Sequence, residues 1–412
     1  MRRMAYWVVL LGLIVRGMAM AEAQVVVSKN FVKKSFAVTG FTGDAAVAGQ
    51  VTEVLKNDVR LSGYLALAQS SDAEFVQQGS VRADRGGLTI DCSVTEKATK
   101  RTVLSQSYPA SAQDLRRAAH VISDDIVKAA TGQRGIAQTK IAFVWTHGKA
   151  KELAVMDYDG YNARQLTYDK SISVHPRWSP DGRRIIYTSF LQTFPDVLEA
   201  DLYTTKRRRI ASFPGLNSGA VFSPDGQSIA LTLSKDGNPE LYTMNANGGS
   251  LQRLTHTAGA ESSPTWSPDG QSITYVSDDR GSPQIYQIRR EGGEPTRLTV
   301  SPAYNTEPDW SRPPSGSNMA SMLAVTSRVA GRFEIGIYDS ATRAVVPKVA
   351  DDADNADPSW APNGRFLVFT KTRRWRSRLY LLDVLTGEQV ELPAVEGDAS
   401  EPAWGPWSGN IK

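Results

Sequence analysis

The chain has few of the residues on which most metal sites and many catalytic sites depend. Its 412 residues include one cysteine, Cys92, and four histidines, His120, His147, His175 and His256. A single cysteine cannot form an internal disulfide, and no two histidines have the i, i+4 spacing of a helical zinc-ligand pair. The Gly-x-Ser-x-Gly elbow of the α/β-hydrolases is absent as well. We therefore expect no metal site, no cofactor and no catalytic residues, and we expect Cys92 to be buried as a small apolar side chain.

The sequence also lacks a hydrophobic run long enough to cross a bilayer. The longest apolar stretch, 4–15, has twelve residues, whereas a membrane-spanning helix needs about 20. Basic residues precede this stretch, and the motif Ala21-Glu22-Ala23 follows it, a combination typical of a cleaved signal peptide. We assign 1–23 to a signal peptide and expect an exported mature chain. The formal net charge of +4 is too small to predict nucleic-acid binding.

A short motif built around a tryptophan or phenylalanine is repeated six times in the second part of the chain. In three copies the aromatic residue is followed by Ser-Pro-Asp-Gly, and in the other three by a degenerate form. The aromatic residues lie 44, 44, 44, 50 and 44 residues apart, at Trp178, Phe222, Trp266, Trp310, Trp360 and Trp404. A repeat of about 40–50 residues with one tight turn per unit is typical of propeller blades or of a solenoid.

The strand pattern within each repeat favours the propeller. In the third copy, segments 272–276, 284–288 and 296–299 are rich in strand-forming residues and are separated by polar turns. Together with the segment at Trp266 they predict four short antiparallel strands and no helix per repeat. Four strands per unit are typical of a propeller blade.

The two ends of the repeat region predict how the ring closes. Only eight residues follow Trp404, too few for three more strands. Three strand-like segments without a motif of their own precede the first copy, at 139–145, 152–157 and 163–167. The ring closes, without exposed strand edges, if the strand at Trp404 completes the sheet that these segments begin. We therefore expect a six-bladed β-propeller over 136–412, with its last blade closed by the C-terminal strand.

Residues 24–135 predict a separate α+β domain. Segment 44–61 has apolar residues at helical spacing with Gly63 beyond its end, and Ser111 is placed to cap a second helix that ends at Gly132. Four strand-like segments accompany them, at 35–41, 80–83, 88–95 and 102–107. We expect two helices on a mostly antiparallel sheet.

This ordered set of features resembles the TolB family, the periplasmic propellers of the Tol-Pal system. The resemblance covers the mature chain and rests on the segments SFAVTGF (35–41), LKNDVRLSGY (55–64), FSPDG (222–226), NTEP (305–308) and EPAW (401–404). It implies a periplasmic protein with two partners, a Pal-like peptidoglycan-associated lipoprotein and a TolA-like inner-membrane protein. It further implies a role in outer-membrane integrity and cell division, with peripheral association with the outer membrane through Pal.

The same resemblance implies where these partners bind. In the family, Pal contacts the loops that enter the propeller just before each blade's aromatic residue. The matching residues of this chain are Asn217, Ser218, Gly219, Ser262, Asn305, Thr306 and Glu307. Leu216 and Ser262 depart from the histidine and threonine that family members often carry at these positions. The mature N-terminal segment, roughly 24–34, corresponds to the TolA-binding arm of the family.

Two enzyme classes remain as alternatives, because propellers occur in both. A polyuronide lyase would need a cluster of histidine, arginine and metal in the channel, and four scattered histidines offer little for it. A peptidase-like propeller would need a hydrolase domain, which the sequence does not contain. A protein-binding function is therefore the better-supported interpretation.

Overall fold

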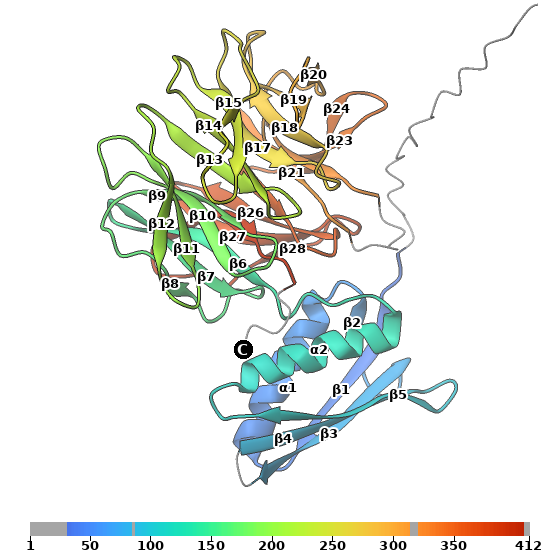
Figure 1. Cartoon of the computed structure of the whole chain (residues 1–412). Helices are drawn as coiled ribbons and strands as arrows, with labels where there is room; N and C mark the ends of the chain where they lie inside the picture. The colour runs from blue at the N-terminus through green and yellow to red at the C-terminus, as the bar shows by residue number, and fades with distance from the viewer. Residues whose placement is uncertain (1–30, 85–86, 314–319, 408–412) are drawn as a thin grey trace, which may run out of the picture.

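The computed structural model describes residues 31–84, 87–313 and 320–407, which form a small N-terminal α/β unit beside a larger all-β unit (Figure 1). The expected signal peptide, 1–23, and most of the expected arm, 24–34, lie outside the described residues. Among the residues described, no helix is long and apolar enough to cross a membrane.

The N-terminal unit is a five-stranded sheet with two helices packed on one face. Its strand order is β2-β1-β3-β4-β5. The elements are β1 (Lys34–Thr42), α1 (Ala45–Leu61), β2 (Leu65–Leu67), β3 (Phe75–Asp84), β4 (Gly87–Glu96), β5 (Arg101–Ala110) and α2 (Leu115–Thr131). The sheet is less antiparallel than expected, because β1 runs parallel to both β2 and β3. Helix α1 carries the chain back between β1 and β2, which is how parallel strands are joined.

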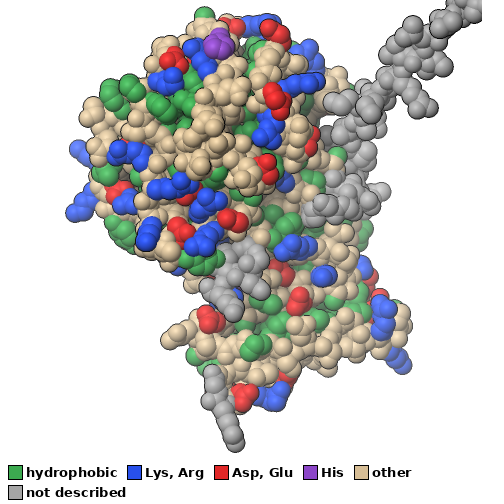
Figure 2. All heavy atoms as spheres, in the orientation of Figure 1, with side chains coloured by type: hydrophobic (Ala, Val, Ile, Leu, Met, Phe, Trp, Pro, Cys, Tyr) green, Lys and Arg blue, Asp and Glu red, His purple; other side chains and the backbone are tan. Residues whose placement is uncertain are grey.

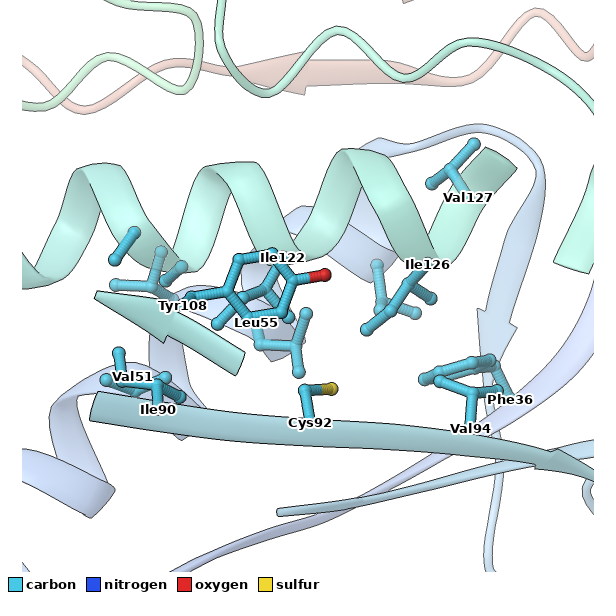
Figure 3. Packing of buried hydrophobic residues seen from close by; sticks show 14 of the residues in the cluster. Phe36, Val51, Leu55, Ile90, Cys92, Val94, Tyr108, Ile122, Ile126 and Val127 are labelled. Atoms are coloured by element: carbon cyan, nitrogen blue, oxygen red, sulfur yellow. The ribbon is translucent and has the colours of Figure 1, made fainter. Parts of the chain in front are cut away.

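The core of this unit lies between the helices and the sheet (Figure 3). The buried side chains include Val51 and Leu55 of α1, Ile122 and Ile126 of α2, and Phe36, Ile90 and Val94 of the sheet. Cys92 lies in the same core with 2% of its surface exposed, as predicted. Burial raises the pKa of its thiol to about 12, so the residue remains a neutral apolar group.

The two helices begin differently. Asp44 caps α1, because its carboxylate accepts hydrogen bonds from the backbone nitrogens of Ala46 and Val47 at 3.1 and 3.0 Å. The prediction that Ser111 caps α2 is wrong. Asp114 holds the cap position, and the Ser111 hydroxyl donates to its carboxylate at 2.9 Å.

The all-β unit is a ring of six four-stranded antiparallel blades, here numbered I to VI. Blade I contains β29 (Asp398–Trp404), β6 (Lys140–His147), β7 (Ala150–Asp157) and β8 (Arg164–Gln165), and blade II contains β9 (Ser173–Trp178), β10 (Arg184–Ser189), β11 (Asp196–Asp201) and β12 (Arg207–Ala211). Blade III contains β13 (Asn217–Phe222), β14 (Ser228–Leu233), β15 (Glu240–Asn245) and β16 (Gln252–Arg253), and blade IV contains β17 (Glu261–Trp266), β18 (Ser272–Ser277), β19 (Gln284–Arg289) and β20 (Thr296–Arg297). Blade V contains β21 (Asn305–Trp310), β22 (Leu323–Val329), β23 (Arg332–Asp339) and β24 (Ala344–Val349), and blade VI contains β25 (Asp354–Trp360), β26 (Phe366–Arg373), β27 (Arg376–Asp383) and β28 (Gln389–Glu391).

The ring closes as the sequence predicts. Strand β29 pairs antiparallel with β6, with Trp404 opposite Ile141. The indole nitrogen of Trp404 also donates to the Thr139 hydroxyl at 2.8 Å, which fixes the last strand to the residue just before β6. The prediction of a six-bladed propeller closed by its C-terminal strand is confirmed.

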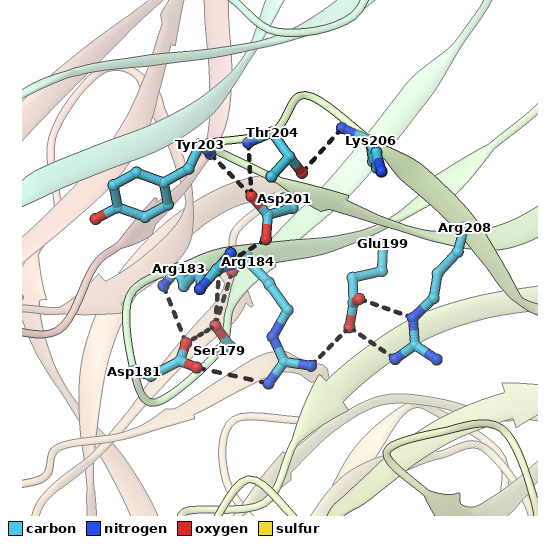
Figure 4. A network of polar contacts seen from close by, with 10 residues as sticks. All are labelled: Ser179, Asp181, Arg183, Arg184, Glu199, Asp201, Tyr203, Thr204, Lys206 and Arg208. Atoms are coloured by element: carbon cyan, nitrogen blue, oxygen red, sulfur yellow. Dashed lines mark hydrogen bonds and ion pairs between the residues drawn. The ribbon is translucent and has the colours of Figure 1, made fainter.

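The repeated Ser-Pro-Asp-Gly motif is turn chemistry. In blade II the Ser179 hydroxyl donates to the Asp181 carboxylate and accepts the backbone N–H of Arg184 at 2.9 Å (Figure 4). The same pair of contacts recurs at Ser223 in blade III and at Ser267 in blade IV. The motif therefore joins the first two strands of a blade, at the end of the channel opposite to that where those first strands begin.

Candidate functional site: the mouth of the propeller channel

The first strand of every blade begins at one end of the central channel, which we call the mouth. A cavity of about 200 Å³ opens there. Its lining includes His175, Arg177, Leu216, Ser218, Gly219, Ser262, Ser263, Glu307, Asp357 and Glu401. Residues from all six blades therefore meet in one hollow.

One backbone feature, repeated in each blade, brings these side chains together. Each first strand contains a bulge, and one residue of the bulge has a positive φ, between 49° and 62°. These residues are His175, Gly219, Ser263, Glu307, Asp357 and Glu401, and all six line the cavity. Each lies three residues before the aromatic residue of its blade. A left-handed conformation is unfavourable for residues other than glycine, so its occurrence in five non-glycine residues indicates a backbone that the fold imposes.

Carboxylates of this ring join neighbouring blades. Glu307 accepts the backbone N–H of Asp357 at 2.8 Å, and Glu401 accepts that of His175 at 2.8 Å. Between these two contacts, the Thr370 hydroxyl donates to Asp357 at 2.9 Å and accepts the N–H of Glu401 at 3.0 Å. Blades V, VI, I and II are thus linked in series through polar groups at the mouth.

The mouth has an acidic side, formed by three blades, and an uncharged side, formed by two, while blade II contributes His175 and Arg177 between them. Blades V, VI and I place Glu307, Asp357 and Glu401 side by side. Enclosure in the mouth, together with the charge of Asp357, raises the pKa of Glu307 to about 7. Enclosure, together with the charge of Glu401, raises the pKa of Asp357 to about 6. Near neutral pH these carboxyls therefore include protonated forms that can donate hydrogen bonds.

The uncharged side is formed by blades III and IV. It presents the small side chains of Ser218, Ser262 and Ser263 around Gly219. The Ser218 hydroxyl lies 3.2 Å from the Thr188 hydroxyl. Small residues allow another protein backbone to approach closely, and their hydroxyl groups can both donate and accept hydrogen bonds.

The structure separates the predicted site residues into two groups. Ser218, Gly219, Ser262 and Glu307 line the cavity, and Thr306 is half-buried beside Glu307. The side chains of Asn217 and Asn305 are fully buried. Asn217 bonds to the backbone of Phe213 at 2.8 and 2.7 Å, and Asn305 accepts the Ser327 hydroxyl at 2.6 Å. These two amides shape the loops from inside and do not reach the mouth.

The predicted site residues did not include Arg177, Asp357 and Glu401, three charged residues that also line the cavity. Asp357 and Glu401 occupy the same position in the repeat as Glu307, three residues before an aromatic residue. The repeat spacing that predicted the blades could therefore also have predicted all six positive-φ residues that line the mouth.

A second polar cluster lies where the N-terminal unit meets blade I. The Asp58 carboxylate accepts from His120 Nδ1 and from the Tyr158 hydroxyl, both at 2.8 Å. Arg116 of α2 pairs with Asp159 of the propeller. In the described part of the chain, Asp58, His120 and Asp159 are the one group placed closely enough to hold a metal. The Arg116 guanidinium already neutralises Asp159, so the cluster is better explained as an ion-pair network than as a cation site.

Three comparisons place the chain among known proteins. Residues 127–408 match the family model of the TolB beta propeller domain. The Tol-Pal system protein TolB of Chromobacterium violaceum is 32% identical over 233 residues, which are 51% of this chain and 54% of the relative. The TolB of Methylococcus capsulatus is 34% identical over 241 residues, 52% of this chain and 57% of the relative. The chain thus spans about half the length of the curated relatives it matches.

The fold similarity extends further than the sequence similarity. The crystal structure of TolB from Acinetobacter baumannii superposes with a TM-score of 0.81 at 27% identity. That match covers 91% of this chain and 97% of the other. It therefore includes most of the N-terminal unit as well as the propeller.

Proposed function

The chain belongs to the TolB β-propeller family, and from this we propose that it serves as a protein-binding component of a Tol-Pal system. In this role it binds a Pal-like peptidoglycan-associated lipoprotein and a TolA-like inner-membrane protein, and so contributes to outer-membrane integrity and cell division. It works in the periplasm after loss of the signal peptide, 1–23. Its function is binding rather than catalysis.

We place the Pal-like partner at the mouth of the channel, and the cavity there is the observation that carries this proposal. A rigid ring of loops around a hollow suits the recognition of a folded protein. The contact residues are Ser218, Gly219, Ser262, Thr306 and Glu307, in an interface of about 1,600 Å² in total. The acidic side of the mouth favours a partner that inserts a positively charged side chain or several N–H donors.

The TolA-like partner is assigned to the N-terminal arm, roughly 24–34. The described end of this segment is held at the junction of the two units. Lys33 pairs with Glu388 of blade VI at 2.8 Å, and the ring of Phe31 lies 4.1 Å from the Arg365 guanidinium. The arm therefore joins the body of the protein where its two units meet. We take these units as the domains 24–135 and 136–412.

A binding measurement with a purified Pal-like protein tests the assignment to the mouth. Ser262→Arg and Thr306→Arg should each weaken the complex at least about tenfold, because a bulky charge would stand in the contact. Gln271→Arg is the matched control, since Gln271 is an exposed residue of blade IV at the opposite end of the channel. All three variants should melt within a few degrees of the wild type, because Gln271 is exposed and Ser262 and Thr306 are only partly buried, and substitutions away from the core rarely exceed about 0.5 kcal/mol. Unchanged affinity in both mouth variants would contradict the assignment.

One observation favours a second candidate function, a polyuronide lyase. The mouth brings His175 and Arg177 together with Glu307, Asp357 and Glu401, and a base beside a cation is what proton abstraction from an acidic sugar requires. We rank this candidate lower because a single histidine is present. A screen of the purified protein against polyuronides, with and without divalent metal, tests it. Turnover that disappears in His175→Ala would establish the lyase.

A further inference from the structure

Blade II carries an apolar loop where blades III and IV carry polar ones. The loop between β10 and β11, 190–195, reads FLQTFP, whereas loops of the same length read SKDGNP (234–239) in blade III and DDRGSP (278–283) in blade IV. Phe190, Leu191 and Phe194 are 42, 49 and 53% exposed. The neighbouring blades show that the fold does not require apolar residues at this tip, so their exposure indicates a contact with something else.

Backbone contacts join this loop to two other segments in a single surface. The backbone N–H of Phe190 donates to the carbonyl of Ile172 at 2.8 Å, and that of Lys151 donates to the carbonyl of Ser171 at 2.9 Å. Ile172 and Tyr168 are themselves 40 and 71% exposed. We call this surface the apolar–lysine patch. It consists of Tyr168, Ile172, Phe190, Leu191 and Phe194 together with Lys149, Lys151 and Lys170.

Lys149 and Lys170 are exposed and available to attract an anionic surface, whereas the charge of Lys151 already acts on Glu401 and His175 at the mouth. Within the described ranges, none of the three makes an ion pair with a carboxylate. The nearby carboxylates are already engaged, since Asp169 pairs with Arg207 and Glu152 accepts from the Thr167 hydroxyl and the Lys170 backbone. In the view of Figure 2, exposed hydrophobic side chains lie among Lys and Arg side chains at the outer edge of the propeller.

We propose that the apolar–lysine patch docks the propeller on a bilayer of anionic phospholipid. Aromatic and leucine side chains that enter the headgroup region, with lysines around them, are typical of proteins that bind a membrane surface peripherally. The choice of cation favours lipid over protein, because lysine is depleted in protein interfaces whereas arginine is enriched. This contact goes beyond the proposed partners, because it uses loops of blades I and II at the mouth end of the propeller and not the residues assigned to Pal.

Sedimentation of the purified mature protein with vesicles tests the proposal. Vesicles of phosphatidylethanolamine and phosphatidylglycerol should bind the protein, vesicles of phosphatidylcholine should bind it much more weakly, and salt should reduce binding. Phe190→Ser with Phe194→Asn gives the loop the residues of blade III at these positions and should weaken binding at least about tenfold. Lys149→Gln with Lys170→Gln should weaken binding about thirtyfold.

Arg280→Gln, at the equivalent tip of blade IV, is the matched control and should leave vesicle binding unchanged. Melting temperatures would show whether the variants fold. If the double phenylalanine variant does not fold, the double lysine variant still tests the proposal. The proposal is overturned if the wild type does not bind the anionic vesicles, or if both pairs bind them as the wild type does. It is also overturned if the protein is a dimer that the double phenylalanine substitution converts to a monomer. Binding of an acidic polypeptide, without binding of vesicles, would overturn it as well.

Discussion

Replacing Arg365 by methionine should loosen the junction between the propeller and the N-terminal unit. Arg365 follows the first turn of blade VI, and its side chain is completely buried. Its guanidinium pairs with Asp383 at 2.6 Å and contacts the rings of Phe31 and Tyr64, 4.1 and 4.6 Å from their centres. One residue of the propeller therefore anchors two aromatic residues of the N-terminal unit.

The size of the effect follows from the burial. Asp383 is only 3% exposed, so Arg365→Met leaves a carboxylate without its counter-charge away from water. Removal of one partner from a buried pair costs about 3–5 kcal/mol. Loss of the cation–π contacts adds about 1–2 kcal/mol. Asp383→Asn in the same chain removes the orphaned charge and keeps an oxygen for the backbone N–H of Leu385, so the double variant should recover a large part of the loss.

The repeat supplies a control at the equivalent position. Arg183 follows the first turn of blade II and pairs with Asp201 at 2.8 Å, but its side chain is 53% exposed. Arg183→Met removes the same ion pair in water, where such pairs contribute little. Denaturation followed by tryptophan fluorescence should show a large loss of stability for Arg365→Met and a small one for Arg183→Met. Limited proteolysis near residue 33 should also become faster in Arg365→Met alone.

Two results would refute this reasoning. If Arg365→Met lost no more stability than Arg183→Met, the buried pair would not hold the junction. If the double variant were as unstable as the single one, the loss would come from packing of the arginine side chain and not from the orphaned charge of Asp383.

Three other perturbations have expected outcomes. The carboxylates of Asp58, Asp159 and Asp157 outweigh burial and raise the pKa of His120 above 6.5. The contribution of His120 to stability is therefore complete below about pH 6.5 and is lost as pH rises through its folded-state pKa. Urea titrations across this range should show a pH dependence that His120→Gln removes. The wild type should lose stability as pH rises from about 4.5 to 7, because the raised pKa of Glu307 makes its charged form unfavourable in the folded state. Glu307→Gln should remove this loss. Deletion of 401–412 should lower the melting temperature strongly, because loss of a buried aromatic residue such as Trp404 alone costs about 3–5 kcal/mol. Deletion of 408–412 should not lower it. Equal melting temperatures of the two truncations would contradict ring closure through β29.

The architecture was predictable because the propeller repeats its local chemistry. A turn serine, an aspartate and a glycine recur after three of the six aromatic residues, and Ser179 and Ser223 make the same contacts in the structure. Ring closure followed from counting strands on either side of that motif. Where no repeat supported the prediction, as at Ser111, the expected helix cap was wrong, and the structure uses Asp114 instead.

The polar junction could not be predicted in this way, since its residues come from unrelated elements. His120 and Asp58 lie 62 residues apart on two helices, and Tyr158 lies 100 residues from Asp58 in the first blade. Each appears in the sequence as an ordinary polar residue, and only the packing of three elements makes them a buried network. Long-range ion pairs of this kind leave no periodic pattern in a single sequence.

Differences between equivalent positions of the repeat separate the needs of the fold from those of function. The six bulges share one backbone conformation, and Gly219 and Ser263 show that this conformation does not itself require a carboxylate, although Glu307 and Glu401 also accept backbone N–H groups of the next blade. The same comparison distinguishes the exposed pair of Arg183 from the buried pair of Arg365, and FLQTFP in blade II from SKDGNP in blade III. In each case the fold accepts either residue, so the residue present reflects what that blade contacts. At Arg365 the contact is the neighbouring unit; at the mouth and at the apolar–lysine patch we propose that it is a partner protein and a lipid surface.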